Sequence, residues 1–193
     1  MFALLARTLN QTMSLSYKKP SRLLEESGVA YLDILRLGGD GAFYGAILLL
    51  DGRGLPLEFV HNRLVPPSGL LWTEPDVSRE AITALSHSLF DACRREPDLL
   101  LCLPGLGPPD FCRVEIAPVL PFAQVLPPQE DIPAGLVWIN EPPASGMRGH
   151  HLYQELLRRD ALFEPFNRLR RALREVYTQA PWPSPGDGGD APE

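Results

Sequence analysis

Carboxylates are the side chains of this sequence with the clearest potential for metal chemistry. Asp33 lies within Gly28 to Leu35, a run that is otherwise apolar. A buried carboxylate without a partner is costly, so Asp33 must face water, a partner or a metal ion. If Glu80 and Asp98 converged with Asp33, the three could hold the Mg²⁺ or Mn²⁺ ions of a phosphate-cleaving site. The alternative is that these acids are solvated or form salt bridges.

Arginines concentrate near the C-terminus, where residues 147–177 hold seven Arg against four acids. The candidate binding residues among them are Arg168, Arg170, Arg171 and Arg174. Three roles stay open: docking on the acidic remainder of the chain, binding an acidic partner protein, or contacting nucleic acid. Aromatic residues for base stacking are sparse in this stretch, which is unfavourable for the third role.

A smaller polar group ends the third predicted strand. His61 and Arg63 fall on one face of that strand, and Glu58 and Asn62 fall on the other. His61 and Arg63 could bind an anion, and His61 could transfer protons. The alternative is an ordinary polar exit from a strand.

Motifs for thiolate, zinc or phosphate chemistry are not recognisable. The three cysteines, Cys93, Cys102 and Cys112, contain no CxxC pair, which fits free thiols in a reducing compartment. The histidines are not spaced as structural zinc ligands. The sequence therefore predicts no cofactor, apart from Mg²⁺ or Mn²⁺ in the carboxylate interpretation.

The element that must position Asp33 is a three-stranded antiparallel meander over residues 28–64. Gly38-Gly39-Asp40-Gly41 and Asp51-Gly52-Arg53-Gly54 separate three apolar runs of strand length and supply residues that tolerate positive φ. The middle run is uncharged, which is typical of a central strand covered on both faces. In the third run, alternation places Leu57 and Phe59 on one face and Glu58 on the other.

The remaining predicted elements follow from apolar spacing and proline positions. A helix is predicted over 78–96, a strand over 99–103, and two C-terminal helices over 151–162 and 164–179. Short strands are predicted over 114–117, 122–126 and 136–139, within the Pro-rich segment 104–143. We expect a loosely ordered arm over 1–20, one domain over 21–179 and a disordered acidic tail over 180–193.

Charge and composition limit the classes of function. The 193 residues carry a formal net charge of −6, which argues against general binding to nucleic acid or anionic membranes. No stretch approaches the roughly 18 apolar residues that would span a bilayer. These observations predict a cytoplasmic protein.

The element order strand-strand-strand-helix-strand over about residues 28–103 resembles the ribonuclease-H-like fold. Enzymes with that fold hold two divalent metals with Asp and Glu, the first on strand one, where Asp33 stands. The resemblance implies a metal-dependent nuclease or phosphohydrolase. The family also places an acid at the end of the fourth strand, and Leu99 to Leu103 carries none.

Taken together, the sequence predicts an α+β fold in which the 78–96 helix and the two C-terminal helices pack on an antiparallel sheet. Because no convergent set of reactive residues is recognisable, we expect a non-enzymatic interaction module that binds a protein partner. The binding residues would be Arg168, Arg170, Arg171, Arg174, His61 and Arg63. The alternative is a metal-dependent nuclease or phosphohydrolase that uses Asp33.

Overall fold

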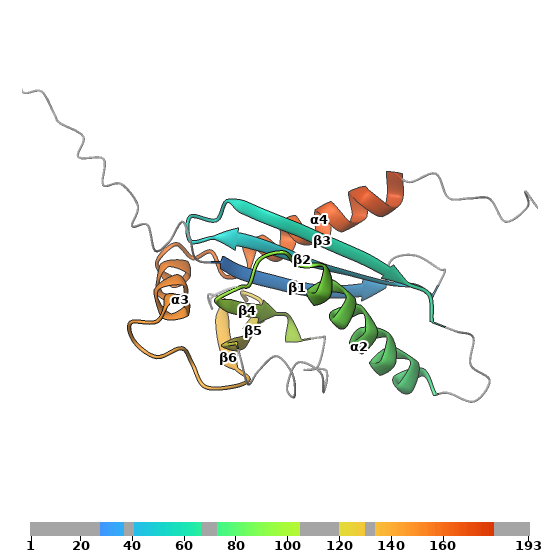
Figure 1. Ribbon diagram of the computed structural model, residues 1–193, viewed down its shortest axis with the longest axis horizontal. Coiled ribbons are helices and arrows are strands. Elements are labelled where there is room, and N and C mark those ends of the chain that lie inside the picture. Colours follow the sequence, from blue (N-terminus) through green and yellow to red (C-terminus); the bar gives the residue numbers. More distant parts are fainter. Residues whose placement is uncertain (1–27, 37–40, 67–72, 105–119, 130–133, 180–193) are drawn as a thin grey trace, which may run out of the picture.

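The computed structural model describes residues 28–36, 41–66, 73–104, 120–129 and 134–179. It contains a six-stranded sheet in the order β3-β2-β1-β4-β5-β6 (Figure 1). The strands are β1 (Gly28–Arg36), β2 (Phe43–Asp51), β3 (Pro56–Leu64), β4 (Leu99–Cys102), β5 (Phe122–Leu126) and β6 (Gly135–Trp138). The helices are α2 (Glu74–Ala92), α3 (Arg148–Arg158) and α4 (Glu164–Gln179).

The predicted meander is confirmed as β1, β2 and β3, which pair antiparallel in sequence order. Asp51 begins the second turn, and its Oδ1 accepts hydrogen bonds from the backbone N–H groups of Arg53 and Leu55 at 2.9 and 2.8 Å. Gly54 has a φ of 83°, a conformation that glycine adopts without strain. All nine residues of β2 are buried, as expected for the central strand of the meander.

Two features of the sheet differ from the prediction. The sheet is mixed, because β4 pairs parallel to β1 and β5 pairs parallel to β4. Parallel neighbours need a crossover connection, and α2 supplies it between β3 and β4. A register shift in β3 also places Leu57 with the α2-side core, whereas Phe59 packs on the α4 side. The extra residue of a β-bulge reverses the alternation that the sequence pattern assumes.

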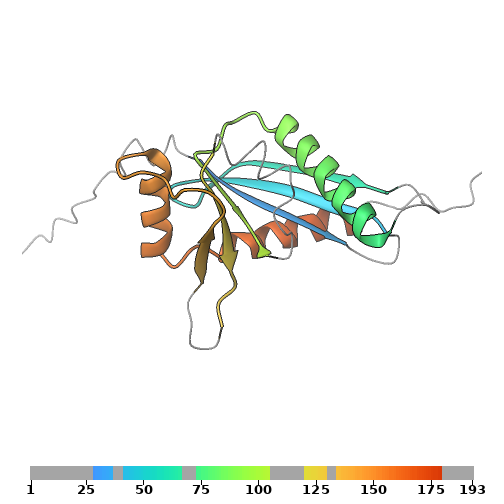
Figure 2. The ribbon, with the colours of Figure 1, turned by 90° about the horizontal axis from the view of Figure 1, so that it is seen from below.

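The helices cover the two faces of the sheet. α2 lies on one face, and α3 and α4 belong to the core on the other face (Figure 2). α2 begins four residues before the predicted helix, because Thr73 caps it by accepting from the backbone N–H of Asp76. It ends four residues before the predicted end, where Cys93 adopts an extended backbone conformation. α3 covers 148–158, because Asp160, with a φ of 51°, ends the helical path after Arg159.

The remaining strand predictions have different outcomes. β4, β5 and β6 agree with the predicted strands to within one residue at each end. The predicted strand 114–117, the arm 1–20 and the tail 180–193 lie outside the described residues. Within the described residues, no helix has the length and apolar character needed to span a membrane.

Two separate apolar cores lie on the two sheet faces, and their composition follows from alternation along β1. Ala30, Leu32 and Ile34 face α2, whereas Val29 and Tyr31 face α3 and α4. Asp33 has the same parity as Tyr31, so its carboxylate points toward the α4 side. The α4 side of the sheet is therefore the side that carries the candidate functional carboxylate.

Candidate functional site

The register of β1, β2 and β3 divides the α4 side of the sheet into an apolar half and a polar half. In the apolar half, Tyr31, Leu48 and Phe59 are cross-strand neighbours. Two further rows form the polar half: Asp33 beside Ala46 beside His61, and Leu35 beside Tyr44 beside Arg63. We call the polar residues of these rows, together with Arg170, Arg174 and Tyr177 of α4, the polar end of the sheet.

Asp33 and Arg170 form the inner contact of the polar end. Arg170 Nε lies 2.5 Å from Asp33 Oδ2. Asp33 is 2% exposed, whereas the Arg170 side chain is 39% exposed. The ion pair therefore consists of a buried carboxylate and a partly solvent-exposed guanidinium. Burial raises the pKa of Asp33, and the hydrogen bond and charge of Arg170 offset part of that rise. Asp33 was expected to face water, a partner or a metal ion, and the structure shows a partner, which is an arginine.

Aromatic side chains surround the outer part of the polar end. His61 Nδ1 lies 3.1 Å from the Tyr177 hydroxyl, and Arg63 Nε donates to the Tyr44 hydroxyl at 3.2 Å. Tyr44 and Tyr177 pack edge to face with ring centroids 4.7 Å apart. Burial and the neighbouring Tyr44 raise the pKa of Tyr177, so its hydroxyl stays protonated at neutral pH. The end of α4 is thereby tied to both β2 and β3.

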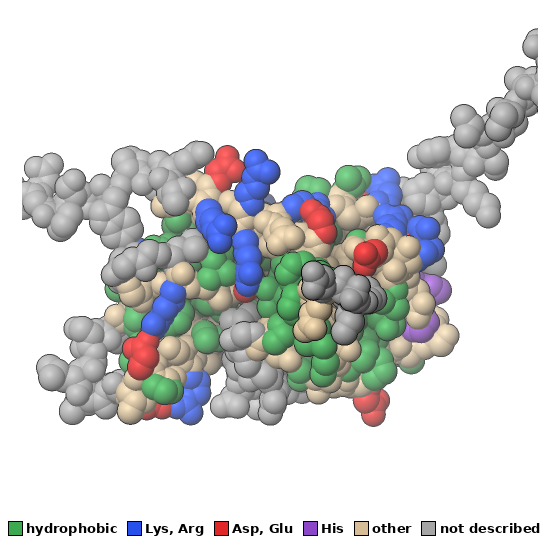
Figure 3. Space-filling view, turned by 180° about the vertical axis from the view of Figure 1, so that it is seen from behind, with side chains coloured by type: hydrophobic (Ala, Val, Ile, Leu, Met, Phe, Trp, Pro, Cys, Tyr) green, Lys and Arg blue, Asp and Glu red, His purple; other side chains and the backbone are tan. Residues whose placement is uncertain are grey.

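The arginines of α4 are divided between the two sides of the helix. Arg168 bonds to Glu164 and donates to the Gly54 carbonyl oxygen at 3.1 Å, so it ties α4 to the β2–β3 turn. Arg171 and Arg174 are exposed, and Arg174 follows Arg170 by one helical turn. Figure 3 shows basic side chains grouped on the face of the molecule that carries α4.

The predicted carboxylate triad does not converge. Glu80 is exposed on α2, which covers the opposite face of the sheet from Asp33. Asp98 precedes β4, and its Oδ2 accepts from the Gly28 backbone N–H at 3.0 Å. Since Gly28 begins β1 and Asp33 is five residues further along, the two carboxylates are about 16 Å apart along the strand. Asp98 therefore joins the starts of β1 and β4 and does not complete a site with Asp33.

The residues present do not fit a divalent-metal centre at Asp33. Over the described parts of the chain, no three His, Cys, Asp or Glu side chains lie close enough to hold a metal ion. The Asp33 carboxylate already forms an ion pair with the Arg170 guanidinium, which a metal cation would have to displace.

The two described cysteines, Cys93 and Cys102, do not belong to the polar end. Cys102 is buried in the α2-side core. Burial and the charge of Glu58 raise the pKa of Cys93 to about 11, so its thiol is protonated at neutral pH. Cys112 lies outside the described residues.

Sequence reasoning missed the aromatic part of the site and the pairing of its charges. The sequence patterns single out neither Tyr44 nor Tyr177 as a site residue. The signal that could have found them is register: pairing β2 with β3 places Tyr44 beside Arg63. The Asp33–Arg170 contact spans 137 residues of sequence and leaves no local signature.

Comparisons with known proteins give a likeness of structure only. No family model matches the chain, and no curated protein matches it in sequence. An endonuclease V from Streptomyces avermitilis has 12% identity and a TM-score of 0.45, covering 78% of this chain and 83% of its own. An endonuclease V from Bacillus subtilis has 14% identity and a TM-score of 0.43, covering 79% of this chain and 80% of its own. At these values the likeness assigns neither an activity nor a residue role to this chain.

The comparisons nevertheless correct one expectation. The sequence led us to expect a non-enzymatic module that binds a protein partner, whereas both solved structures are nucleases. We therefore withdraw that expectation.

Proposed function

We propose that this protein binds nucleic acid through the polar end of the sheet and the adjoining surface of α4. The observation that carries the proposal is the convergence of cationic and aromatic side chains from three elements on one surface. Arg63 comes from β3 and Arg170 from α4, and Tyr44, His61 and Tyr177 lie on the same side of the sheet. Arg171 and Arg174 are exposed on α4 beside them.

The chemistry of this surface suits a polyanion with flat bases. Guanidinium groups bind phosphate in a forked geometry, and aromatic rings and arginine planes stack on bases. The net charge of −6 belongs to the whole chain, whereas residues 147–177 carry seven Arg against four acids. On an acidic protein, a local cationic surface attracts a polyanion to that surface, and the acidic remainder of the protein repels the polyanion elsewhere.

Metal-dependent hydrolysis at Asp33 is the second candidate function. It is favoured by the place of Asp33 on the first strand of a sheet whose element order resembles the ribonuclease-H-like fold. The Asp33–Arg170 pair and the separate positions of Glu80 and Asp98 argue against it. Cleavage of a bound oligonucleotide with Mg²⁺ or Mn²⁺, abolished in Asp33→Asn, would promote this candidate.

The test is fluorescence anisotropy of labelled oligonucleotides titrated with the full chain at several salt concentrations. We expect binding whose logarithm falls linearly with the logarithm of salt concentration. The double variant Arg171→Glu/Arg174→Glu should weaken binding about tenfold or more and flatten the salt dependence, because two phosphate contacts are lost. Arg170 is left intact because its loss would leave the buried Asp33 carboxylate without its partner.

The matched control is Arg158→Glu/Arg159→Glu on α3. It makes the same change in charge on exposed residues that bond to Glu155 and not to the polar end. Equal loss of affinity in both double variants would show a general charge effect. Absence of binding by the unaltered protein at low salt would overturn the proposal.

A further inference from the structure

A groove of about 670 Å³ runs along the free edge of β3. Its lining comes from β3, over Leu57 to His61, and from the end of α2 and the residues after it: Ala92, Arg94 and Arg95. Among the described residues, β3 is the terminal strand of the sheet and pairs only with β2, so its other edge presents backbone N–H and C=O groups to the groove. The lined part of β3 is about 13 Å long.

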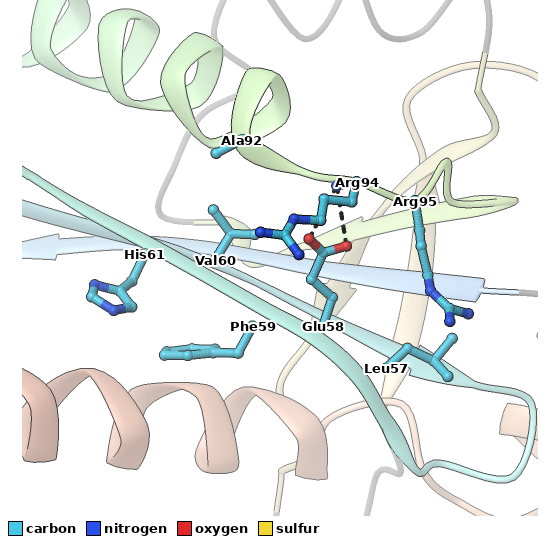
Figure 4. Close-up of a pocket in the computed structure, with 8 residues that line it drawn as sticks. All are labelled: Leu57, Glu58, Phe59, Val60, His61, Ala92, Arg94 and Arg95. Carbon is cyan, nitrogen blue, oxygen red and sulfur yellow. Dashed lines mark hydrogen bonds between the residues drawn. The ribbon is translucent and has the colours of Figure 1, made fainter.

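Arg94 and Arg95 lie beside this edge because hydrogen bonds hold the segment after α2 against β3. The Glu58 carboxylate accepts the Arg94 backbone N–H through both oxygens, at 3.0 and 3.2 Å (Figure 4). This contact fixes the segment by its backbone and leaves the Arg94 and Arg95 side chains exposed beside the groove. With one carboxylate and two guanidiniums, the lining has a net positive charge.

Aromatic rings border the same groove on the other side of the strand. Figure 4 shows Phe59 and His61 pointing toward α4, away from Arg94. Their ring centroids are 5.4 Å apart at an interplanar angle of 34°, and His61 is exposed. His61 also contacts Tyr177, so the rings continue into the polar end of the sheet. Phe59 packs against the α4-side core, so the groove has cations on one border and the exposed His61 ring on the other.

This arrangement fits a single strand of nucleic acid better than a duplex. Ring surfaces bind bases whose faces are free, and in a duplex those faces are stacked on their neighbours. The groove admits one extended chain, with phosphates beside Arg94 and Arg95 and bases toward His61.

We therefore propose that the edge groove of β3 is a binding site for single-stranded nucleic acid. This inference rests on the proposed function, since it names the form of nucleic acid and adds a second surface that shares His61 with the first.

The test compares a labelled oligothymidylate with a duplex of the same length, using the full chain. We expect the single strand to bind at least tenfold more tightly. Arg94→Glu/Arg95→Glu should lower single-strand affinity about tenfold and reduce the slope of log affinity against log salt by about 1.4, the effect of two single-strand phosphate contacts. Photocrosslinking of an iodouracil-substituted strand should map to His61.

The control for folding is the thermal midpoint, which Arg94→Glu/Arg95→Glu should leave within a few degrees of the unaltered protein, since both side chains are exposed. A folded variant with unchanged affinity would overturn the groove assignment. Equal binding of duplex and single strand, or equal competition by polyglutamate, would also overturn it. If only Arg171→Glu/Arg174→Glu weakens binding, the proposed function stands and the groove assignment fails. If the unaltered protein binds no nucleic acid, both fail.

Discussion

Asp33 and Arg170 form a pair whose partners differ in exposure, and this difference predicts unequal effects of mutation. Arg170→Ala leaves a buried carboxylate unpaired, which should lower the free energy of unfolding by about 2–3 kcal/mol. Asp33→Asn keeps a hydrogen-bond acceptor, and the 39%-exposed Arg170 side chain can turn to solvent. That change should cost about 1 kcal/mol. Urea unfolding measures both values, with Arg171→Ala as the exposed control.

The pH dependence gives a second measurement on this pair. Burial raises the pKa of Asp33 in the folded state, so the folded protein binds the proton more tightly than the unfolded chain. Stability contributed by the protonated carboxyl is therefore lost as pH rises above about 4, the ordinary range for Asp. Arg170→Ala removes the hydrogen bond and the charge that hold the pKa of Asp33 down. The loss of unfolding free energy in this variant, relative to the unaltered protein, should therefore grow as pH rises above about 4. A destabilisation that shrinks with pH would contradict the assigned geometry.

At the scale of elements, α4 holds the polar end in place through its apolar stripe. Phe166, Leu169 and Leu173 are each 0% exposed, and Phe166 packs edge to face on Tyr31 at 5.1 Å. Beyond Leu173, Tyr177 reaches β2 and β3. Displacement of α4 would therefore separate Arg170 from Asp33 and Tyr177 from His61 together.

Leu173→Ala should lower the free energy of unfolding by about 2–4 kcal/mol, because it leaves a cavity under α4. Val176→Ala is the matched control, since Val176 lies on the same helix and is 38% exposed. Its cost should stay below about 1 kcal/mol. Similar costs for the two variants, measured by chemical denaturation, would show that α4 is not anchored as described.

At the scale of the whole molecule, charge is distributed unevenly along the chain. Residues 180–193 contain three acids and no base, so a chain ending at Gln179 would carry a formal charge of −3 in place of −6. Their removal should speed association with nucleic acid at low salt by weakening long-range repulsion. The gain should vanish at about 1 M salt, where the screening length is about 3 Å. Stopped-flow binding measures this, and an increase that persists in high salt would indicate direct contact by the tail.

Local sequence signals accounted for much of the fold. Asp-Gly turns between apolar runs predicted the meander, and periodicity predicted α2 and α4 to within a few residues at their ends. The parallel pairing of β4 and β5 was not predicted, because a short apolar run such as Leu99–Cys102 has no feature that distinguishes parallel from antiparallel neighbours. The Leu57 bulge was missed because one inserted residue reverses alternation without changing composition.

For the candidate site, the sequence by itself determined that Asp33 must face water, a partner or a metal ion, because a carboxylate in an apolar strand cannot stay uncompensated. It also determined that His61 and Arg63 share a face, because side chains alternate along a strand. Only the tertiary structure decided that Asp33 meets Arg170, and that Glu80 and Asp98 lie elsewhere. Long-range contacts depend on strand order and on which face each helix covers. Strand order and helix placement depend on how all the apolar surfaces pack together, and the local residue pattern does not encode them.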